Sequence, residues 1–408
     1  MTDILLVLPV PFRRLDGEIY LESQAANGLD RWADNFDQVV VACPVMPEAE
    51  VAKRSSWNWV SAQTLAHKER IRLVELPWAR SIGAFLANYG TTSRLLAEHI
   101  RHCDHLQFAI GGIVGDWGSV AALQAARMQR RYSVWTDRVE AEVVRITSAR
   151  KPPIRKYLSL LHAWLMQHYE RHIIRQAELG LFHGAETYHA YSAYPRHAFL
   201  THDIHTKAAD QIPDALLAEK IRLSLDPGVP LKIGYAGRAN VMKAPLDWLD
   251  ALARLDDIGV TYEAAWLGDG ELLEEMRRFI ERHGMAGRVK LLGFVSDRQE
   301  VLAFLRSCHV LLFTHITPES PRIILEALIS AMPVVGYQSS YVAEIVAAEE
   351  SWMLCPIGDT TALAGIVATL AGEREKLAAA IRAAAHAGKH FNDEAVFRHR
   401  SELIKHYL

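Results

Sequence analysis

Cysteine is scarce in this sequence, and long hydrophobic runs are missing from it. The four cysteines, Cys43, Cys103, Cys308 and Cys355, are scattered without the spacing of a metal site or a disulfide framework. No stretch reaches the roughly eighteen apolar residues that a membrane-spanning helix needs. The first residues contain Asp3 and a short apolar run, unlike a signal peptide. We therefore expect a reduced, cytoplasmic protein that does not span a membrane.

An excess of charge of one sign is also missing. The chain has 45 Lys and Arg residues against 48 Asp and Glu residues, and its net charge is −3. Without a basic field there is no reason to expect a nucleic-acid partner. Hydrophobic residues make up 50% of the 408 residues. A chain of this length is too large for one compact core, so we expect two domains of about 200 residues each.

Apolar runs alternate with helical patterns in both halves of the chain. Strands separated by helices predict an α/β fold with doubly wound parallel sheets. We place a linker around 202–229, with a first domain at 1–205, a second at 206–389 and a terminal helix within 390–408 that returns to the first domain. The expected strands lie near residues 4–8, 38–43, 71–75, 107–112, 132–136, 178–183, 231–236, 262–267, 288–292, 309–314, 333–337 and 352–355.

Residues 319–335 carry the strongest chemical signal. The spacing of their apolar residues predicts a short helix, with Ser320 as its cap and Pro321 in its first turn. Glu326 would lie in the second turn between apolar positions, where a carboxylate needs a partner. A diphosphate held at the helix start, with Arg322 beside it, would bring an attached ribose within reach of Glu326. The alternative is an ordinary capped helix before a strand.

A second group of residues follows the apolar run Leu231–Ala236. Gly237, Arg238 and Lys243 come before an amphipathic helix expected from about residue 244 to 255. A strand, turn and helix place Arg238 and Lys243 at the carboxyl end of a sheet, where open α/β sheets bind ligands. A planar guanidinium and a mobile ammonium suit a diphosphate that gains negative charge as its bond to a sugar breaks. Either residue alone would more often be a solvated surface charge.

Together the two segments resemble the retaining glycosyltransferases of family four, also called glycosyl transferases group 1. The resemblance is specific across about 230–360 and only architectural before 200. It implies a GT-B fold, in which two Rossmann-like domains face each other across a cleft, and a UDP- or GDP-sugar as co-substrate with no cofactor. In this family the sugar is transferred on the same face, and the leaving phosphate helps to take the acceptor proton. The matching residues are Gly237, Arg238, Lys243, Glu326, Ala327, Pro333, Val334, Val335 and Glu344.

The first glutamate of the family's pair is displaced in this chain. The family has about seven residues between its two glutamates, whereas six separate Glu319 from Glu326, and Pro318 stands at the expected position. The resemblance implies that the first glutamate fixes the donor sugar, so a one-residue loop shift would make Glu319 a catalytic residue beside Arg238 and Lys243. Alternatively, Pro318 has replaced that function and Glu319 is only an acid near the helix start.

Two further turns are donor-binding candidates. Gly268 and Gly270 end an expected strand in a turn that opens space for a ligand or for a neighbouring backbone. In the family this turn adjoins the nucleotide, as does the loop that matches Gly293, Phe294 and Val295, whose backbone can read a base edge. The alternative for each turn is ordinary punctuation between a strand and a helix.

The first half of the chain offers less specific candidates. The family has a glycine pair after the first strand, where this chain has Asp16 and Gly17, so only Gly17 is carried over to the donor site. A helix is expected from about residue 19 to 33. His183 ends an expected strand and is either a sugar contact or a satisfied core histidine. The acceptor-side candidates, which follow expected strands, are Asp16, Asp116, Asp137 and Arg138.

A long helix is expected after Pro153. It carries aromatic and aliphatic residues at helical spacing and basic residues at its ends. Helix 154–175 can lie in an anionic membrane interface, giving peripheral contact with the inner membrane face. It can equally be a core helix with a solvated basic edge.

The combined reading is a retaining glycosyltransferase that moves a hexosyl or related group from a nucleotide-diphosphate sugar to a glycan or lipid-linked acceptor, in polysaccharide or glycolipid biosynthesis. We expect no metal, since the diphosphate clamp makes one unnecessary and there is no Asp-x-Asp motif to hold it. Two alternatives stay open: a sugar-nucleotide epimerase, and a non-catalytic nucleotide-sugar-binding protein, which the displaced glutamate favours. A dehydrogenase is disfavoured because no Gly-x-Gly-x-x-Gly follows the first strand.

Overall fold

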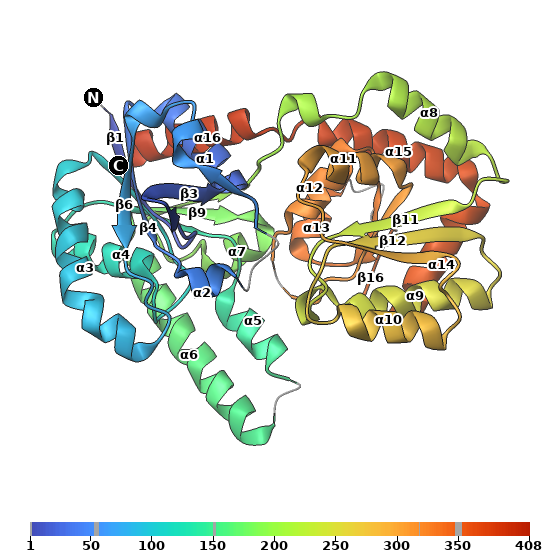
Figure 1. The fold of residues 1–408 in the computed structure, drawn as a ribbon, viewed down its shortest axis with the longest axis horizontal. Helices are drawn as coiled ribbons and strands as arrows, with labels where there is room; N and C mark the ends of the chain where they lie inside the picture. Colours follow the sequence, from blue (N-terminus) through green and yellow to red (C-terminus); the bar gives the residue numbers. More distant parts are fainter. Residues whose placement is uncertain (1, 53–56, 150–151, 318, 347–352) are drawn as a thin grey trace. The chain divides into compact units, whose positions relative to one another are not determined.

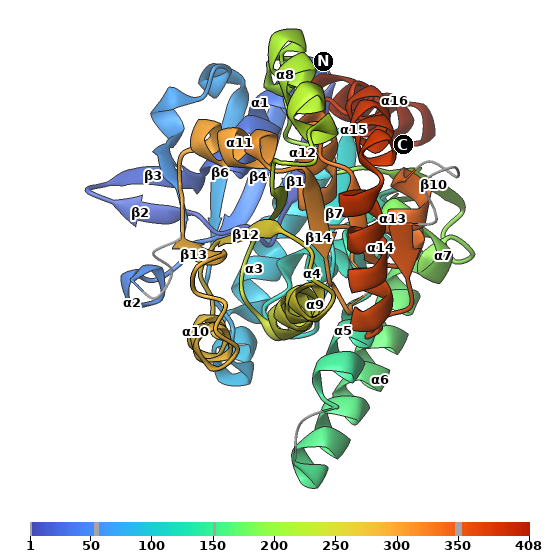
Figure 2. The same cartoon turned by 90° about the vertical axis from the view of Figure 1, so that its right-hand side faces the viewer.

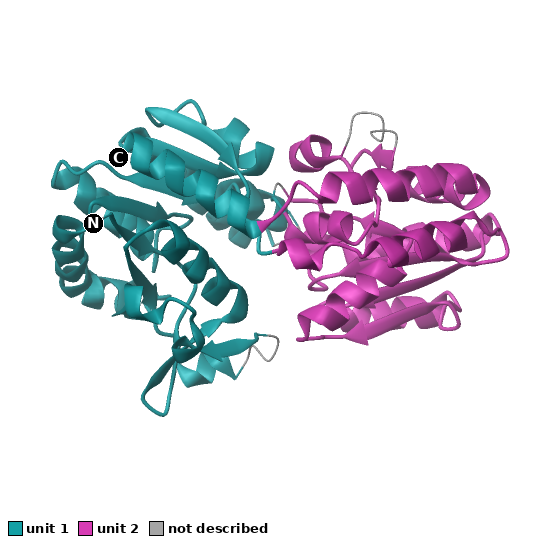
Figure 3. Ribbon diagram, turned by 90° about the horizontal axis from the view of Figure 1, so that it is seen from above, with its two compact units in different colours: residues 1–205, 318–320, 393–408 teal, residues 206–317, 321–392 magenta. Residues whose placement is uncertain are grey.

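The protein divides into two compact units (Figure 3). The first contains Met1–His205, Pro318–Ser320 and Asp393–Leu408, and the second contains Thr206–Thr317 and Pro321–Asn392. Each unit has its own parallel sheet with helices around it (Figure 1). The computed structural model describes residues 2–52, 57–149, 152–317, 319–346 and 353–408.

The first unit is built on a seven-stranded parallel sheet in the order β10-β9-β8-β7-β1-β4-β6. Its strands are β1 (Asp3–Val7), β4 (Gln38–Pro44), β6 (Ile71–Leu76), β7 (His105–Ala109), β8 (Ser133–Thr136), β9 (Leu179–His183) and β10 (His197–Thr201). Its helices include α1 (Ser23–Asn35), α2 (Glu48–Val51), α3 (Ile82–His102), α4 (Trp117–Arg127), α5 (Glu140–Thr147), α6 (Pro153–Arg175), α7 (Gly184–Tyr191) and α16 (Asp393–Tyr407).

Strand β1 is buried on both faces of this sheet. Leu5 and Val7 join a core that α3, α4 and the end of α6 complete, whereas Ile4 and Leu6 join the core beneath α1 and α16. Neighbouring residues of a strand point to opposite faces. A strand covered on both sides must therefore be a continuous apolar run, and this pattern made β1 predictable.

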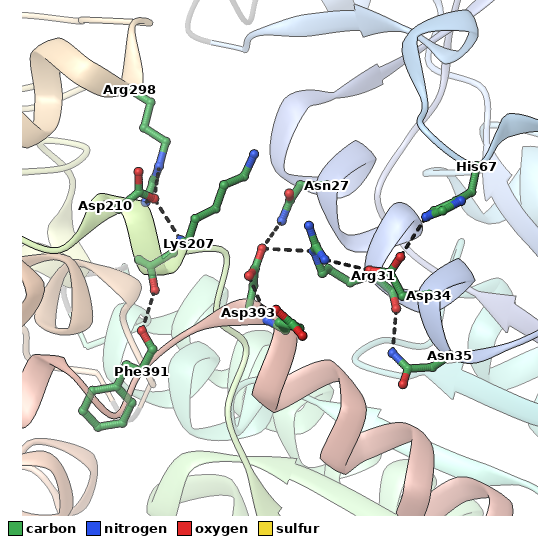
Figure 4. A network of polar contacts seen from close by, with 12 residues as sticks. Asn27, Arg31, Asp34, Asn35, His67, Lys207, Asp210, Arg298, Phe391 and Asp393 are labelled. Atoms are coloured by element: carbon green, nitrogen blue, oxygen red, sulfur yellow. Dashed lines mark hydrogen bonds and ion pairs between the residues drawn. The ribbon is translucent and has the colours of Figure 1, made fainter.

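Helix α16 completes the core of the first unit from far along the chain. Phe397 and Ile404 are buried in the same cluster as Trp32 of α1. Arg400 is also buried, and its guanidinium lies 3.9 Å from the ring centroid of Trp135. Burial lowers the pKa of Arg400 to about 10. At the start of the helix, Asp393 accepts a hydrogen bond of 2.9 Å from Asn27 (Figure 4).

A small antiparallel sheet corrects the expectation of a helix from residue 19. Strands β2 (Arg13–Leu15), β3 (Glu18–Glu22) and β5 (Trp59–Ser61) form it, in the order β2-β3-β5. Asp16 and Gly17 make the two-residue turn between β2 and β3, with φ of 48° and 83°. Asp-Gly favours this type of hairpin turn, since both residues tolerate positive φ. Helix α1 begins four residues later than expected because the hairpin comes first.

The second unit holds a six-stranded parallel sheet in the order β13-β12-β11-β14-β15-β16. Its strands are β11 (Leu231–Ala236), β12 (Tyr262–Leu267), β13 (Val289–Gly293), β14 (Val310–Phe313), β15 (Val334–Tyr337) and β16 (Leu354–Cys355). Its helices include α8 (Asp214–Leu225), α9 (Pro245–Asp257), α10 (Leu273–Arg282), α11 (Arg298–Ser307), α12 (Arg322–Ile329), α13 (Ser340–Ile345), α14 (Thr360–Gly372) and α15 (Arg374–Gly388).

Helix α8 lies inside the segment 202–229 that the sequence suggested as a linker. It packs against α15 within the second unit. Lys220 of α8 is buried and donates a hydrogen bond of 3.0 Å to the carbonyl of Ser330. Burial lowers the pKa of Lys220 to about 7. Most of the expected linker is therefore a packed part of the second unit.

Helix α6 combines the two readings that its sequence left open. Its second half is a core helix, with Ala163, Met166, Ile173 and Ile174 buried. Its first half is exposed around its circumference, so the core reading is wrong there. Among the described residues, no helix has both the length and the low polarity that crossing a membrane requires.

Candidate active site

Arg238 and Lys243 both lie in the connection that follows β11. Arg238 is exposed directly after the strand. Lys243 ends a short 3-10 helix at Val241–Lys243, where Asn240 Oδ1 accepts a hydrogen bond of 3.2 Å from the Lys243 N–H. Helix α9 then begins at Pro245. The local fold thus places both cations at the carboxyl end of β11, as the sequence predicted.

The side chain of Lys243 is held by a buried histidine. Lys243 Nζ lies 3.2 Å from His315 Nδ1, and His315 Nε2 lies 2.6 Å from the hydroxyl of Tyr235. An ammonium group can only donate, so Nδ1 accepts, the ring proton sits on Nε2, and Nε2–H donates to the tyrosine. His315 and Tyr235 were missed from sequence. The signal available was a polar residue soon after a buried strand, here β14.

The two glycines after β12 make room for a neighbouring backbone. A Cβ at Gly268 would lie 2.1 Å from the carbonyl oxygen of Gly237, and one at Gly270 would lie 2.4 Å from that of Ala239. Both glycines also have φ near 150°, at 144° and 151°. The sequence suggested that these glycines make space either for a ligand or for a neighbouring backbone, and the structure shows a neighbouring backbone there. This turn keeps the segment that carries Arg238 against the end of β12.

The loop after β13 meets this turn. Gly268 donates a backbone hydrogen bond of 2.7 Å to the carbonyl of Gly293. Phe294 follows and is 42% exposed, which is unusual for so large an apolar side chain. Val295 is half-buried. The second unit therefore brings Gly237, Gly268 and Gly293 together, with Phe294 beside them in sequence.

Glu326 has a charged partner within the second unit. Arg298 of α11 lies 3.2 Å from Glu326 and 3.0 Å from Asp210, and the pair with Asp210 is visible in Figure 4. Burial alone would lower the pKa of Arg298, but the carboxylates of Glu326 and Asp210 outweigh it and the pKa is raised. Arg298 and Asp210 were missed because only the tertiary fold brings them to α12. The partner that a carboxylate between apolar positions needs is thus already present.

Ser320 does not cap α12, so that expectation is wrong. The helix starts after Pro321, and no side chain caps it. The Ser320 hydroxyl instead donates a hydrogen bond of 2.7 Å to the carbonyl of His183. This bond pairs a buried hydroxyl with a buried carbonyl, and either group would cost free energy if it were left unpaired. Arg322 is the first residue of α12 and is exposed.

His183 is a satisfied buried histidine in the first unit. Its Nδ1 accepts a hydrogen bond of 2.9 Å from the Asp203 N–H, so the ring proton is on Nε2, which donates to the carbonyl of Ser320 at 3.0 Å. Burial lowers the pKa of His183, which favours the neutral ring. The core-histidine alternative therefore describes this residue. Its role is to hold the backbone of Ser320.

Glu319 groups with Arg138 in the first unit. Their backbones form an isolated antiparallel bridge. Arg138 Nε donates to Glu140 at 2.6 Å, and Glu140, Asp137 and Glu319 together raise the pKa of Arg138 against the opposing effect of burial. Asp137 is exposed. The structure therefore brings Glu319, predicted as a catalytic residue, together with two predicted acceptor-side residues, Asp137 and Arg138. Residue 318 lies outside the described residues.

Asp116 is occupied as the cap of α4. Its carboxylate accepts hydrogen bonds of 2.9 Å from the N–H groups of Gly111 and Gly112 and 2.6 Å from the Ser119 hydroxyl. Burial raises its pKa. With its oxygens used in this way, Asp116 shapes the loop at the start of α4. Asp16 and Gly17 lie in the turn between β2 and β3.

Part of the chain matches a known protein family. Residues 219–387 match the family described as "Glycosyl transferases group 1". This segment is similar to that family. It contains Arg238, Lys243 and Glu326, for which the sequence predicted donor-side roles. Among the described residues, no group of three or more His, Cys, Asp or Glu side chains could hold a metal ion.

Curated glycosyltransferases are also similar to part of this chain. The amylovoran biosynthesis glycosyltransferase AmsK of Erwinia amylovora is 26% identical over 196 residues, covering 46% of this chain and 48% of AmsK. The putative colanic acid biosynthesis glycosyltransferase WcaL of Escherichia coli K12 is 28% identical over 187 residues, covering 44% and 46%. The chain thus spans about half the length of the curated relatives it matches.

Solved structures match the whole chain. HepE of Anabaena, in complex with UDP, is 15% identical with a TM-score of 0.69 and covers 100% of both chains. Sucrose-phosphate synthase of Thermosynechococcus elongatus is 14% identical with a TM-score of 0.70, covering 100% of this chain and 99% of that one. At these identities the likeness shows the fold alone. The fold is GT-B, with two Rossmann-like domains.

Proposed function

We propose that this protein is a retaining glycosyltransferase that moves a sugar from a nucleotide-diphosphate sugar to a glycan or lipid-linked acceptor. The observation that carries the proposal is the cation pair after β11. Arg238 is exposed there, and Lys243 is held 3.2 Å from His315, all within the segment that matches group 1. Two cations at the carboxyl end of a parallel strand suit an anion whose charge increases during reaction.

The roles of the residues follow from their charges. Arg238 offers a planar fork of donors and Lys243 a point charge, so together they would neutralise the departing nucleoside diphosphate. His315 would keep Lys243 directed at that position, because an ammonium hydrogen-bonded to a fixed ring loses little further freedom on binding. Glu326 would accept from the ribose hydroxyls, beside its ion pair with Arg298. Glu319, or the backbone beside it, would fix the donor sugar.

The class of product is suggested by the relatives. AmsK and WcaL bear the names of amylovoran and colanic acid biosynthesis, and HepE has been solved with UDP and with UDP-glucose. We infer a place in polysaccharide or glycolipid biosynthesis in the cytoplasm, with a UDP- or GDP-sugar as donor. We further infer that the reaction needs neither a cofactor nor a metal ion, because the two cations already offset the charge of the diphosphate.

A panel of UDP- and GDP-sugars tests the proposal. The matching donor should raise the unfolding temperature, because a ligand that binds only the native state stabilises it by mass action. The selected donor is then incubated with and without candidate acceptors, and the anomeric configuration of the product is read by NMR. Release of nucleoside diphosphate with retained configuration supports the proposal. Conversion of the donor into another nucleotide sugar without acceptor would identify an epimerase instead.

A further inference from the structure

The first half of α6 carries an apolar stripe that faces away from the core of its unit. Six large side chains make up this stripe, and each is between 44% and 78% exposed. At about 3.6 residues per turn they all fall on one side of the helix. The stripe consists of Ile154, Tyr157, Leu158, Leu161, Trp164 and Leu165.

The stripe is not a part of the hydrophobic core left uncovered by chance. The buried residues of α6, such as Ala163, Met166 and Ile173, lie on the opposite side of the helix, where α6 packs against α5 and α4. Gln167, which points toward α5, accepts a hydrogen bond of 2.8 Å from Arg145. In Figures 1 and 2 the start of α6 extends beyond the other elements of the first unit. Its apolar side therefore has no partner in its own unit among the described residues.

The charges around the stripe indicate what kind of surface it binds. Arg155 and Lys156 lie on the first turn of α6, are exposed, and make no ion pair within the described part of the chain. Glu170 is the one acidic residue of the helix, and it is buried in the second half. Trp164 and Tyr157 have amphipathic rings of the kind enriched at membrane surfaces. Apolar side chains flanked by cations and without exposed acid match an anionic lipid surface.

We propose that residues 153–165 of α6 dock the protein on an anionic lipid bilayer, with the stripe lying in the interface. The segment is about 20 Å long at 1.5 Å per residue, enough to lie flat among headgroups and too short to cross the hydrocarbon core. A second copy of the chain could also cover the stripe. It would leave Arg155 and Lys156 without an acidic partner from α6, whereas anionic headgroups supply one. The proposal does not depend on the sugar donor.

Co-sedimentation of the full chain with vesicles tests the docking. Binding to vesicles of phosphatidylglycerol should be at least about tenfold tighter than to vesicles of phosphatidylcholine, and added salt should weaken it. The double variant Leu158→Ser, Leu161→Ser should lose at least about tenfold in affinity because it breaks the apolar stripe. Arg155→Gln with Lys156→Gln should lose a similar factor on the anionic vesicles alone, at about fivefold per cation.

Matched variants on the second unit serve as controls. Leu216→Ser with Ile258→Ser removes two apolar side chains that are 50% and 57% exposed. Arg277→Gln with Arg278→Gln removes two exposed cations of α10. Both controls should bind vesicles like the parent. The proposal is wrong if the parent does not bind anionic vesicles, or if the controls lose as much vesicle affinity as the stripe variants. It is also wrong if the parent does not bind vesicles and instead forms a dimer in lipid-free sedimentation that Leu158→Ser, Leu161→Ser dissociates.

Discussion

Glu170 should make the stability of the first unit depend on pH near neutrality. It lies on the buried side of α6 and is 3% exposed. Its Oε2 accepts a hydrogen bond of 2.8 Å from Tyr191, and within the described residues its Oε1 has no partner. Burial raises its pKa to about 7, assisted by the charges of Glu140 and Asp116. The carboxyl group is therefore neutral in the folded protein at mildly acidic pH.

The direction of the effect follows from proton linkage. The unfolded carboxyl ionises near pH 4.5 and the folded one near 7, so over this interval the native state binds the extra proton. The free energy of unfolding then decreases as pH rises, by about 1.4 kcal/mol per pH unit. Over the whole interval the ionisation of Glu170 lowers the free energy of unfolding by about 3 kcal/mol, and above pH 7 this decrease is complete. The stabilisation by protonated Glu170 is therefore fully present at acidic pH and is lost as the pH rises through 7.

Glu170→Gln tests this reasoning, since glutamine keeps the size of the side chain and cannot ionise. At about pH 8 the variant should be more stable than the parent by about 3 kcal/mol, raising the unfolding temperature of a unit this size by roughly 6 to 12 °C. Near pH 4, below the unfolded pKa, the two proteins should unfold alike. Urea denaturation followed across this pH range provides the measurement, with Glu98→Gln, an exposed glutamate on α3, as control. Parallel pH curves for parent and Glu170→Gln would refute the argument.

Three further predictions concern the candidate site. Arg238→Ala and Lys243→Ala should each lower turnover on the order of a hundredfold while the fold persists, and unchanged turnover in both would refute the clamp. Glu326→Gln should weaken nucleotide binding by roughly 1.5 to 3 kcal/mol in calorimetry, and equal affinity would mean that it serves only Arg298. Glu319→Ala should impair binding of the whole donor far more than of the free nucleoside diphosphate; equal losses would place Glu319 outside the sugar site.

The parallel sheets were predictable because a strand that is buried on both faces needs apolar residues at successive positions. Leu231–Ala236 and Tyr262–Leu267 are the two strands whose bounds the sequence matched without error. The antiparallel sheet escaped notice because β2 and β3 have charged and half-exposed residues and lack an apolar run. Asp16-Gly17 is a hairpin-turn signal, but its match to the position of the family's glycine pair pointed to the donor site instead.

The candidate site was predictable only where it depends on local chain order. Arg238 and Lys243 follow a recognisable strand, so their placement needs no tertiary information. His315 lies far away in sequence and reaches Lys243 only because β14 pairs with β11. In the same way, Ser320 has the right residue type for a helix cap, but its hydroxyl donates to the carbonyl of His183 instead. A single sequence does not show which of two possible hydrogen-bond partners a side chain will take.

The return of α16 to the first unit sets the order in which the protein can be completed during synthesis. Phe397 and Ile404 fill a core whose strands precede the second unit in the chain and are therefore synthesised before it. The intervening second unit takes roughly ten to forty seconds to synthesise at ordinary rates of about 5 to 20 residues per second. During that time the face of the sheet beneath α16 stays uncovered, with Trp32 and Trp135 lacking the guanidinium of Arg400. Chaperone binding to ribosome-bound chains should therefore peak in this interval and end once residues 393–408 emerge.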